Sequence, residues 1–590
     1  MHVINLCQFS GTGKRKLTIK AMGKLIALGI SLLLVVGTAI NTAVGHDTDG
    51  FSAGDIAKKA MSSTAMKNVK AICALTDFED ACIKTLTPVA NNKSATPEDY
   101  LKAAFEATNG EVEAALEKSG VIGKDAQGSI DKMAVEDCKE LLQFAIDDLQ
   151  SAISMAGDPE KNKAADVTAE FKNWLSAVVS YQESCIDGFE HPELKNSMQN
   201  GLLNATQLTS NALTIIGQMS SILKALNINF DFNIKSRRRL LDAQGYPTWF
   251  APTDRKLLAL QDNGRVAPNA VVAKDGSGHY KTIAEALAAY PKKKGSQKND
   301  SSTSRYVIYV KAGTYDEYIT ITKDQTNILM YGDGPRRTIV TGHKSNREGI
   351  STFQTASFSV IGDGFICRSM GFHNTAGPEG HQAVALRVQS DRAAFFNCRM
   401  DGYQDTLYVQ AHRQFYRNCV ISGTIDFIFG DSSTVIQNSL IIVRRPLDNQ
   451  QNTVTAQGKK FKDESTGLVL QNCKIVPEQR LVAERLKIPS YLGRPWKEYA
   501  VTVIMESTIG DVIRPEGWMP WAGDFALDTL FYAEYNNRGP GANTDHRVKW
   551  KGFKVITKKD EALRYTVGPF IQGDEWLKDT GSPFTLGLRY

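Results

Sequence analysis

Apolar residues recur at helical spacing through residues 50–230. In segment 138–155 they fall on one face of an amphipathic helix, at Leu141, Leu142, Ala145, Ile146, Leu149 and Ile153. Segment 171–189, FKNWLSAVVSYQESCIDGF, repeats the pattern. Four to six such segments with few β-branched runs are typical of antiparallel bundles. We therefore predict an all-α four-helix bundle over residues 47–236.

From about residue 268 the pattern changes to short β-rich runs broken by Gly, Asn and Asp. Apolar segments ending in asparagine recur with steps of 23, 21, 20 and 34 residues, at Asn374, Asn397, Asn418, Asn438 and Asn472. Near-constant steps without an intervening helix predict an all-β right-handed parallel β-helix over 259–590, in which each repeat is one coil. The long last step predicts a loop insertion. A β-sandwich with coincidental asparagine spacing is the alternative.

The first 46 residues have the pattern of a targeting segment. Basic residues precede an apolar run from Leu25 to Ile40, which at 16 residues is short for a membrane span. This run is a secretory signal or an uncleaved signal anchor, and we expect a secreted, extracellular protein. Three N-x-S/T triplets, at Asn92, Asn204 and Asn299, are candidate glycosylation sites that agree with secretion.

A linker at residues 237–258 separates the two halves. It contains two basic–dileucine words seventeen residues apart, RRRLL (237–241) and DRKLL (254–258). Because proteolytic nicking concentrates in linkers, we interpret both words as exposed cleavage sites. A linker that is merely charged is the alternative.

Charge divides the chain in the same place. Residues 47–236 carry 17 Lys and Arg against 28 Asp and Glu, a net charge of −11, whereas residues 259–590 carry 42 against 34, a net charge of +8. The two halves should attract each other, and the basic half should attract a polyanion. Two differently charged domains that never touch are the alternative.

The cysteines also divide by region. Four lie in the acidic half (Cys73, Cys82, Cys138, Cys185) and four in the basic half (Cys367, Cys398, Cys419, Cys473). None has the CxxC spacing of a zinc site, and we predict no metal. In an oxidising compartment, the four in the helical half suggest two disulfides.

The repeat predicts one polar row across adjacent coils. Eight residues past Asn374, Asn397 and Asn418 lie Gln382, Asp405 and Asp426. If the coils stack in register, these side chains lie about one strand spacing, roughly 4.8 Å, apart. Gln404 should reach the row from its edge. Two stacked carboxylates disfavour double ionisation, so one should keep its proton to higher pH and could supply an acid beside a nucleophile. A solvated ladder of polar residues is the alternative.

The words around this row resemble pectin methylesterases. They are DGSGHYKTIAEAL (275–287), GHQAVALR (380–387), GYQDTLYV (402–409), GTIDFIFG (423–430), LGRPW (492–496), GWMPW (517–521) and YAEYNNRGPGA (532–542). The resemblance covers nearly all of residues 268–575, in the family's order. It implies a carboxylic ester hydrolase that acts on methyl-esterified homogalacturonan in the cell wall, without a cofactor.

The resemblance also implies roles. Asp426 matches the nucleophile that forms an acyl-enzyme, Asp405 the proton donor, and Gln404 the stabiliser of the transition-state oxyanion. Arg494 matches the arginine that pairs with the nucleophile. Four residues match substrate-binding positions: Thr352, Gln382, Arg494 and Trp496. Arg494 as an ordinary ion pair and Trp496 as a core residue are the alternatives.

The helical half resembles the pectinesterase-inhibitor family through its cysteine spacing and the word IDGF after Cys185. That family pairs the first cysteine with the second and the third with the fourth, which implies Cys73–Cys82 and Cys138–Cys185. In the family, paired linker sites separate a pro-region from the mature enzyme. We therefore expect an autoinhibitory pro-domain, with an intramolecular folding aid, or both roles together, as the alternative. We also expect a subtilisin-like protease acting at the linker, a monomeric product and no nucleic-acid partner.

One position departs from the pattern. The family commonly has a cysteine where this chain has Ser439, so Cys419 lacks that partner. Cys419 could pair with Cys398 or both could stay buried thiols.

Two other functions compete with the esterase. The first is a β-helix lyase or hydrolase, which would show dense acidic calcium sites or a catalytic base. The second is a catalytically dead binding protein, which would lack the Asp pair.

Overall fold

The computed structural model describes residues 66–92, 94–126, 128–158, 167–225, 267–291 and 305–589. The predicted leader (1–46), the linker (237–258) and the Asn299 site lie outside these residues. Among the described helices, none combines the length and the apolar character needed to cross a bilayer.

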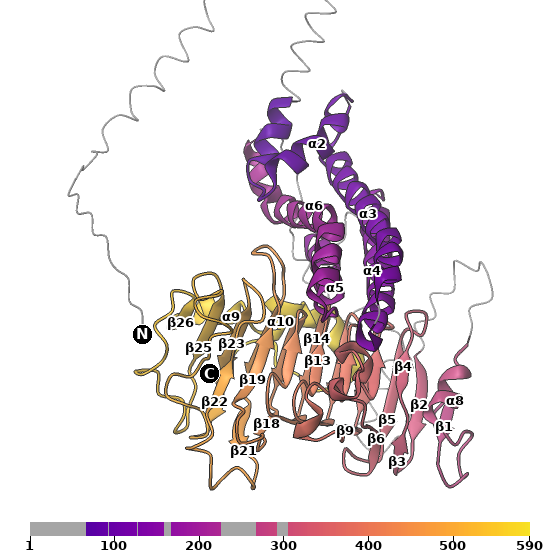
Figure 1. Ribbon diagram of the computed structural model, residues 1–590, viewed down its shortest axis with the longest axis vertical. Coiled ribbons are helices and arrows are strands. Elements are labelled where there is room, and N and C mark those ends of the chain that lie inside the picture. The colour runs from indigo at the N-terminus through magenta and orange to yellow at the C-terminus, as the bar shows by residue number, and fades with distance from the viewer. Residues whose placement is uncertain are drawn as a thin grey trace, which may run out of the picture. The chain divides into compact units, whose positions relative to one another are not determined.

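The N-terminal half is helical, as predicted. It contains α2 (Glu79–Ala90), α3 (Pro97–Ile122), α4 (Ser129–Ala156), α5 (Val167–Asp187) and α6 (Pro192–Ala225) (Figure 1). Helix α3 packs against α4 and α6, and α5 packs against the same two, which closes a four-helix bundle. The sequence sets the start of α3, because Thr96 and Asp99 form a capping box and Pro97 is the first residue of the helix.

Two disulfides stabilise this bundle. Cys73 is bonded to Cys82 and Cys138 to Cys185, which confirms the pairing implied by the inhibitor family. The second bridge joins α4 to α5, and its sulfur atoms lie in the bundle core.

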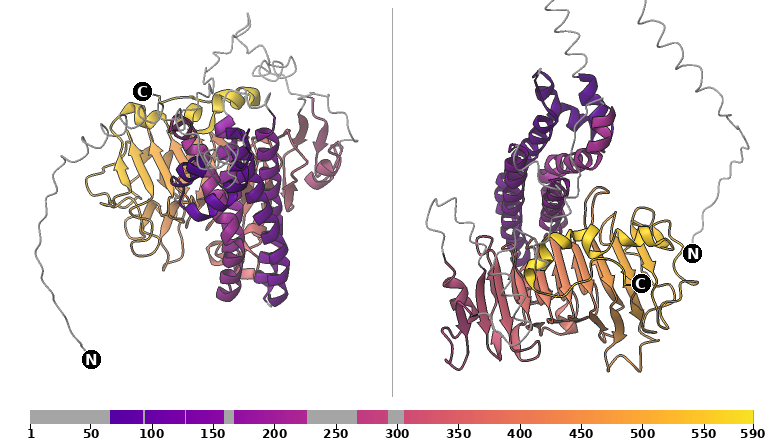
Figure 2. Two further views of the ribbon diagram at one scale, coloured as in Figure 1. Left: turned by 90° about the horizontal axis from the view of Figure 1, so that it is seen from above. Right: turned by 180° about the vertical axis from the view of Figure 1, so that it is seen from behind.

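The C-terminal half consists of three sheets in which every pairing is parallel (Figures 1 and 2). Eleven described strands form the first sheet, in the order β1 (Ala270–Val272), β2 (Tyr306–Val310), β5 (Ile328–Gly332), β8 (Ile366–Arg368), β11 (Ala393–Phe396), β14 (Arg413–Arg417), β17 (Ser433–Gln437), β20 (Gly467–Gln471), β23 (Val501–Met505), β25 (Phe531–Tyr535) and β26 (Phe553–Val555). Seven form the second, in the order β22 (Ser490–Gly493), β19 (Asn452–Gln457), β16 (Ile428–Gly430), β13 (Leu407–Val409), β10 (Leu386–Val388), β7 (Phe358–Val360) and β4 (Ile319–Ile321). Eight form the third, in the order β24 (Thr508–Ile509), β21 (Lys474–Pro477), β18 (Leu440–Val443), β15 (Val420–Gly423), β12 (Arg399–Asp401), β9 (Gly371–Asn374), β6 (Thr338–Gly342) and β3 (Gly313–Asp316).

Successive strands rotate among the three sheets, so the predicted parallel β-helix is confirmed and the β-sandwich is excluded. Buried apolar side chains from all three sheets fill the space between them. The rings of Phe395 and Tyr416, on neighbouring strands, stack with centroids 4.9 Å apart. Helix α8 (Ile283–Ala288) packs against β1 and buries three side chains in this core.

The asparagine ladder is present, with one correction. Asn397, Asn418, Asn438 and Asn472 share a left-handed backbone with φ of 53–55°, at the turn from the first sheet to the third. The prediction that Asn374 belongs to this ladder is wrong, because Asn374 ends β9 in the third sheet. Arg368 pairs with Phe396, so the position equivalent to Asn397 is Ser369, which has a φ of 56°. The Ser369 hydroxyl accepts a hydrogen bond from the side-chain amide of Asn397 at 2.9 Å.

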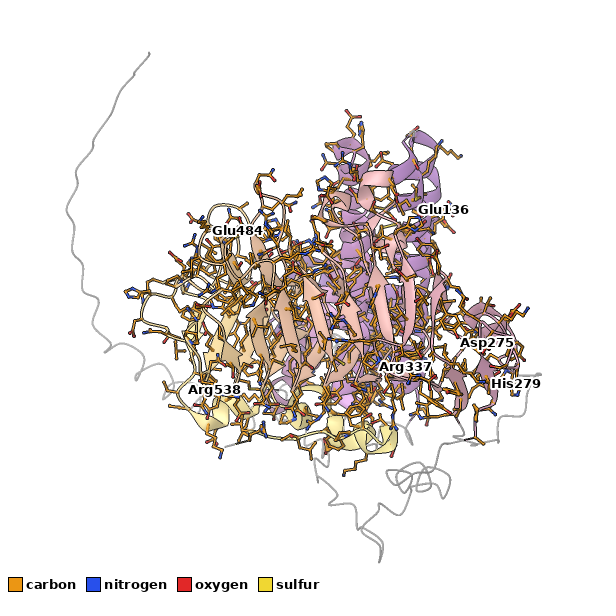
Figure 3. All side chains as sticks on the ribbon, turned by 90° about the horizontal axis from the view of Figure 1, so that it is seen from below. Glu136, Asp275, His279, Arg337, Glu484 and Arg538 are labelled. Carbon is orange, nitrogen blue, oxygen red and sulfur yellow. A yellow bond between two sulfur atoms is a disulfide. The ribbon has the colours of Figure 1, made fainter. Side chains whose placement is uncertain are left out.

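The predicted loop insertion is confirmed. Gln437 pairs with Gln471 in register although 34 residues separate them. The additional residues lie in loops 444–451 and 458–466, on either side of β19. A further long loop joins β21 to β22. Its Glu484, labelled in Figure 3, lies 2.6 Å from Arg445 of the first loop.

The four cysteines of the β-helix are buried thiols. Cys398 Sγ lies 3.7 Å from Cys367 Sγ on the previous coil. The sequence left open whether Cys398 and Cys419 form a disulfide, and in the structure both are free thiols. These side chains pack as small apolar groups inside the helix.

Candidate active site

The two aspartates occupy equivalent positions on adjacent coils. Asp405 precedes β13 and Asp426 precedes β16, and Leu407 pairs with Ile428. Each aspartate therefore lies two residues before one member of this strand pair, so the two are equivalent in the coil, as the repeat predicts. Each has a left-handed backbone, with φ of 62° and 50°, and each is more than nine-tenths buried. Such a conformation is strained for aspartate and is typical of functional sites.

Gln382 does not share the phase of this row. Leu386 pairs with Leu407, so the residue opposite Asp405 is Val384. Gln382 forms a β-bridge with Gln404, whose carbonyl accepts a hydrogen bond from the Ala383 amide at 3.2 Å. The phase prediction for Gln382 is wrong because it started from Asn374. Its expected proximity to Gln404 is confirmed.

Arg494, which follows β22, holds Asp426 in a two-pronged contact. Its Nε donates to both carboxylate oxygens at 2.9 and 3.1 Å, and its Nη2 donates to Oδ2 at 2.6 Å. The Thr453 hydroxyl donates to Oδ1 at 2.6 Å and accepts from the Asp426 amide at 2.9 Å. Three donor groups of two residues, Arg494 and Thr453, thus orient one carboxylate and stabilise its charge.

Asp405 has a different environment. Burial raises the pKa of its carboxyl well above the usual range, and the neighbouring charge of Asp426 raises that pKa further, while Arg494 acts in the opposite direction. Asp405 therefore keeps its proton to higher pH than an ordinary aspartate, whereas Asp426 is paired with a cation. The arrangement provides an acid and a nucleophile of the same residue type side by side.

Two neighbours of this site were missed in the sequence. Thr453 lies on the coil after Asp426 at the same phase, because Ile428 pairs with Thr455. The loop insertion hid that equivalence. Trp521, within the motif GWMPW, has its ring centroid 4.4 Å from the Arg494 guanidinium.

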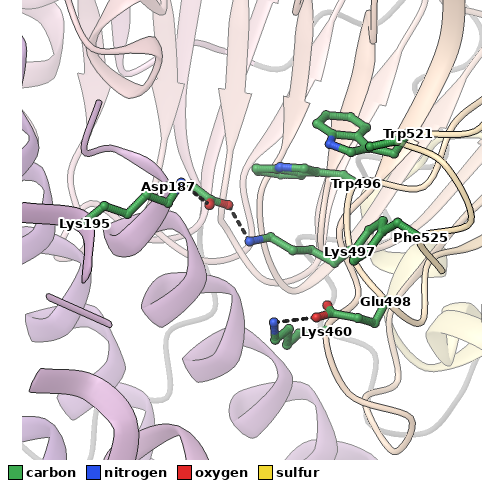
Figure 4. A pocket seen from close by; sticks show the side chains of 9 residues that line it. Asp187, Lys195, Lys460, Trp496, Lys497, Glu498, Trp521 and Phe525 are labelled. Atoms are coloured by element: carbon green, nitrogen blue, oxygen red, sulfur yellow. Dashed lines mark hydrogen bonds and ion pairs between the residues drawn. The ribbon is translucent and has the colours of Figure 1, made fainter. Parts of the chain in front are cut away.

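Aromatic side chains extend from the aspartates. Tyr408 and Phe429, each three residues past an aspartate, stack with centroids 4.3 Å apart, and Trp496 meets Phe429 edge-on at 6.0 Å. A Cβ on Gly458 would lie 2.9 Å from the Trp496 ring, so this approach requires glycine. Trp496, Trp521 and Phe525 line a cavity of about 400 Å³ (Figure 4).

Helix α5 contacts the residues that follow the site. The Ser180 hydroxyl donates to the Gln410 carbonyl at 2.7 Å, and Ser184 hydrogen-bonds with the Tyr408 hydroxyl at 2.9 Å. The predicted substrate residue Thr352 lies in the turn η4 (Thr352–Thr355). Ser351 and Gln354, on either side of it, donate to Asp137 of α4 at 2.5 and 2.6 Å. The bundle core is continuous with apolar residues of this face.

Comparison with known proteins identifies the family. Residues 269–574 match the family described as Pectinesterase, and residues 67–215 match the family Plant invertase/pectin methylesterase inhibitor. The chain is 47% identical over 529 residues to Probable pectinesterase/pectinesterase inhibitor 13 of Arabidopsis thaliana, covering 88% of this chain and 82% of that protein.

The chain belongs to the pectinesterase family.

Other relatives agree. Pectinesterase 1 of Citrus sinensis is 41% identical over 534 residues, covering 88% of each chain. The structure of pectin methylesterase from carrot matches with a TM-score of 0.53 and 50% identity, covering 55% of this chain and all of the carrot chain. This pectinesterase therefore combines an esterase β-helix with an inhibitor-like helical bundle.

Proposed function

We propose that this pectinesterase hydrolyses methyl esters of homogalacturonan through an acyl-enzyme on Asp426. The Asp426 carboxylate attacks the ester carbonyl to give a tetrahedral oxyanion. Asp405 donates its proton to the departing methoxy oxygen, so methanol leaves and an anhydride remains. Water then attacks the galacturonyl carbon of the anhydride while Asp405 takes one of its protons; Asp426 leaves as a carboxylate, and the uronic acid that is released loses its remaining proton to solvent, which restores both aspartates.

The contrast between the two carboxylates is the observation that carries this proposal. Asp426 receives three hydrogen bonds from Arg494, whereas burial and the like charge of Asp426 raise the pKa of Asp405 well above its usual range. In this scheme the paired Gln404 and Gln382 supply amide donors to the oxyanion. Trp496 and Thr352 contact the polysaccharide, and Arg494 both pairs with the nucleophile and borders the substrate.

The first test is the reaction product. We expect the chain, once cleaved at the linker, to release one methanol for each new carboxylate from methyl-esterified pectin. Ultraviolet absorbance of unsaturated uronate should stay at baseline, because ester hydrolysis forms no carbon–carbon double bond. Chain shortening or unsaturated ends without methanol would favour the lyase or hydrolase alternative.

The bundle is, in this proposal, an autoinhibitory pro-domain. Its α5 contacts Tyr408, three residues past Asp405, and pairs with Lys497, three residues past Arg494. A polysaccharide chain could not lie over the same residues. We further propose that the leader at 1–46, as a secretory signal or a signal anchor, directs the chain to the cell wall. A subtilisin-like protease then cuts within 237–258 and releases a monomeric enzyme beginning near residue 259.

Two of the three candidate glycosylation sites lie in the described residues, and their exposure is consistent with secretion. Asn92 and Asn204 both have exposed side chains, and Asn204 lies on α6. A glycan on either would extend into solvent.

Docking of the bundle should depend on pH through His412. The buried Nε2 of His412 lies 3.1 Å from Asp148 of α4 and 3.2 Å from the Tyr181 hydroxyl of α5. Burial lowers the pKa of His412, but the charge of Asp148 outweighs this and leaves that pKa above 6.5; Asp391 adds to the increase and Lys323 opposes it.

Because docking raises the pKa of His412, protonated His412 stabilises the docked state fully at pH values below its ordinary pKa of 6.5. This contribution is lost as the pH rises through the raised pKa. We expect the bundle of the cleaved chain to bind more weakly at about pH 8 than at about pH 6. Titration of the dissociation constant against pH measures this. His412→Gln should flatten the profile, and an unchanged slope in that variant would contradict the assignment.

A further inference from the structure

Lys497 is the most enclosed of the three lysines that line the cavity beside the site. Only 12% of its side chain is exposed, and it directly follows Trp496, with its Nζ 5.6 Å from the Trp496 ring centroid. Both of its carboxylate partners come from α5. Its Nζ lies 2.8 Å from Glu183 Oε2 and 2.7 Å from Asp187 Oδ2. Glu183 and Asp187 are one helical turn apart, so they project from one face of the helix.

Lys460 adds a second cation at the same place. It lies in loop 458–466, with its Nζ 2.8 Å from Glu498 and 3.9 Å from Glu183. Lys460, Lys497 and Asp187 line the cavity together with Trp496, Trp521 and Phe525, and Figure 4 shows Asp187 directed at Lys497. Two lysines of the esterase half thus meet carboxylates of the bundle beside aromatic rings.

Lysine beside aromatic rings suits one kind of ligand. Aromatic rings pack on the apolar faces of a sugar ring, while a buried ammonium selects a carboxylate over its uncharged methyl ester. Without the bundle, Lys497 would lose both carboxylates given above. Its ammonium would remain beside the Trp496 ring and could then pair with an anion that enters the cavity.

We propose that Lys497, with Lys460, forms a subsite for a free uronate carboxylate of the polysaccharide, and that Glu183 and Asp187 of the pro-domain occupy this subsite by mimicking that carboxylate. The inference rests on the proposed function and specifies its substrate. The enzyme would bind chains that already carry a de-esterified unit near the reacting ester. De-esterified chains would also compete with α5 for the lysines and thereby favour release of the bundle.

Binding to the uncleaved full-length chain tests the subsite without relying on activity. The probe is a fully de-esterified galacturonate oligomer, with its fully methyl-esterified counterpart as the neutral reference, and calorimetry measures both affinities. The variant Glu183→Gln with Asp187→Asn removes the two mimicking charges at nearly constant shape. We expect it to bind the charged oligomer at least about tenfold more tightly than the wild type, with a much smaller change for the neutral oligomer.

Adding Lys497→Met to that variant should abolish the gain, and Lys497→Arg should retain most of it. Two matched controls should leave affinity unchanged: Glu113→Gln with Glu117→Gln, an exposed pair at the same spacing on α3, and Lys474→Met on β21. The proposal is overturned if the acidic double variant gains no affinity, if the gain survives Lys497→Met, or if the neutral oligomer gains equally. None of these outcomes bears on whether the wild type releases methanol.

Discussion

Replacing Asp426 by alanine will lower kcat for methanol release by at least about 10⁴-fold. The loss is this large because the residue forms the covalent bond to the acyl group, and other neighbours cannot replace a missing nucleophile. Asp426→Asn should be nearly as inactive, since the amide keeps the shape but loses the charge that Arg494 holds. Methanol release by the linker-cleaved chain measures both variants, and thermal unfolding checks that they are folded.

Asp448→Ala is a suitable control because the Asp448 side chain is 87% exposed. It should keep full activity. Residual activity of the Asp426 variants within about tenfold of the wild type would exclude the covalent route.

The separate roles of the two aspartates can be distinguished by the leaving group. Asp405→Asn should lose roughly 10²–10⁴-fold with the methyl ester, because methanol then departs without a donated proton. An ester of an acidic phenol needs no such proton, so its hydrolysis should be largely restored in Asp405→Asn and not in Asp426→Asn. Activity of the wild type should also fall as pH rises through the raised pKa of Asp405.

The uncleaved chain will be about hundredfold or more less active than the cleaved enzyme. The bundle is covalently attached, so its effective concentration at the site is far above that of a free inhibitor. Replacing the basic residues of both linker words, Arg237–Arg239 and Arg255 with Lys256, should preserve the uncut chain. Full activity of that uncut protein would refute autoinhibition.

A second variant tests whether docking itself causes the inhibition. Arg413 of β14 is buried and bonded to Glu170 of α5 at 2.8 and 3.0 Å and to Asp391 at 2.6 Å. Glu170→Gln removes the bundle's share of this network and leaves the Arg413–Asp391 pair intact. In the uncut background it should raise activity severalfold, whereas Glu136→Gln, an exposed position on α4, should not.

The sequence predicted the two fold classes because their periods differ so clearly. Helical spacing in α4 and α5 and the near-constant steps of the β-helix each repeat often enough to outweigh local irregularity. The disulfide pairing and the row of Asp405 and Asp426 were likewise accessible, the first through family resemblance and the second through coil counting.

The errors arose where the period breaks. Asn374 resembles the ladder residues in sequence but ends a strand of another sheet, so counting from it placed Gln382 opposite Asp405, whereas Gln382 bridges Gln404. What marks a true ladder position is the left-handed turn, and Ser369 adopts it without an asparagine. Thr453 was hidden because the insertion moved it 27 residues from Asp426 instead of about twenty-one.

From the sequence, contacts between the two halves could be anticipated only as a general attraction between a net negative half and a net positive half. Which acid meets which base depends on how α4 and α5 lie against the second sheet, and no local pattern encodes that. Asp148 with His412 and Glu183 with Lys497 illustrate pairs that lie more than two hundred residues apart in the chain.

The insertion after Asn438 has a bearing on how this architecture could have arisen. Loop 458–466 supplies Asp463 and Ser465, which hydrogen-bond with Thr214 of α6 at 2.8 Å and Ser176 of α5 at 3.0 Å, as well as Lys460. These residues lie outside the repeating coil, whose strands resume in register beyond them. Coupling to the bundle can therefore be strengthened or weakened by changes in one surface loop, while the repeating coils that carry the two aspartates stay unchanged.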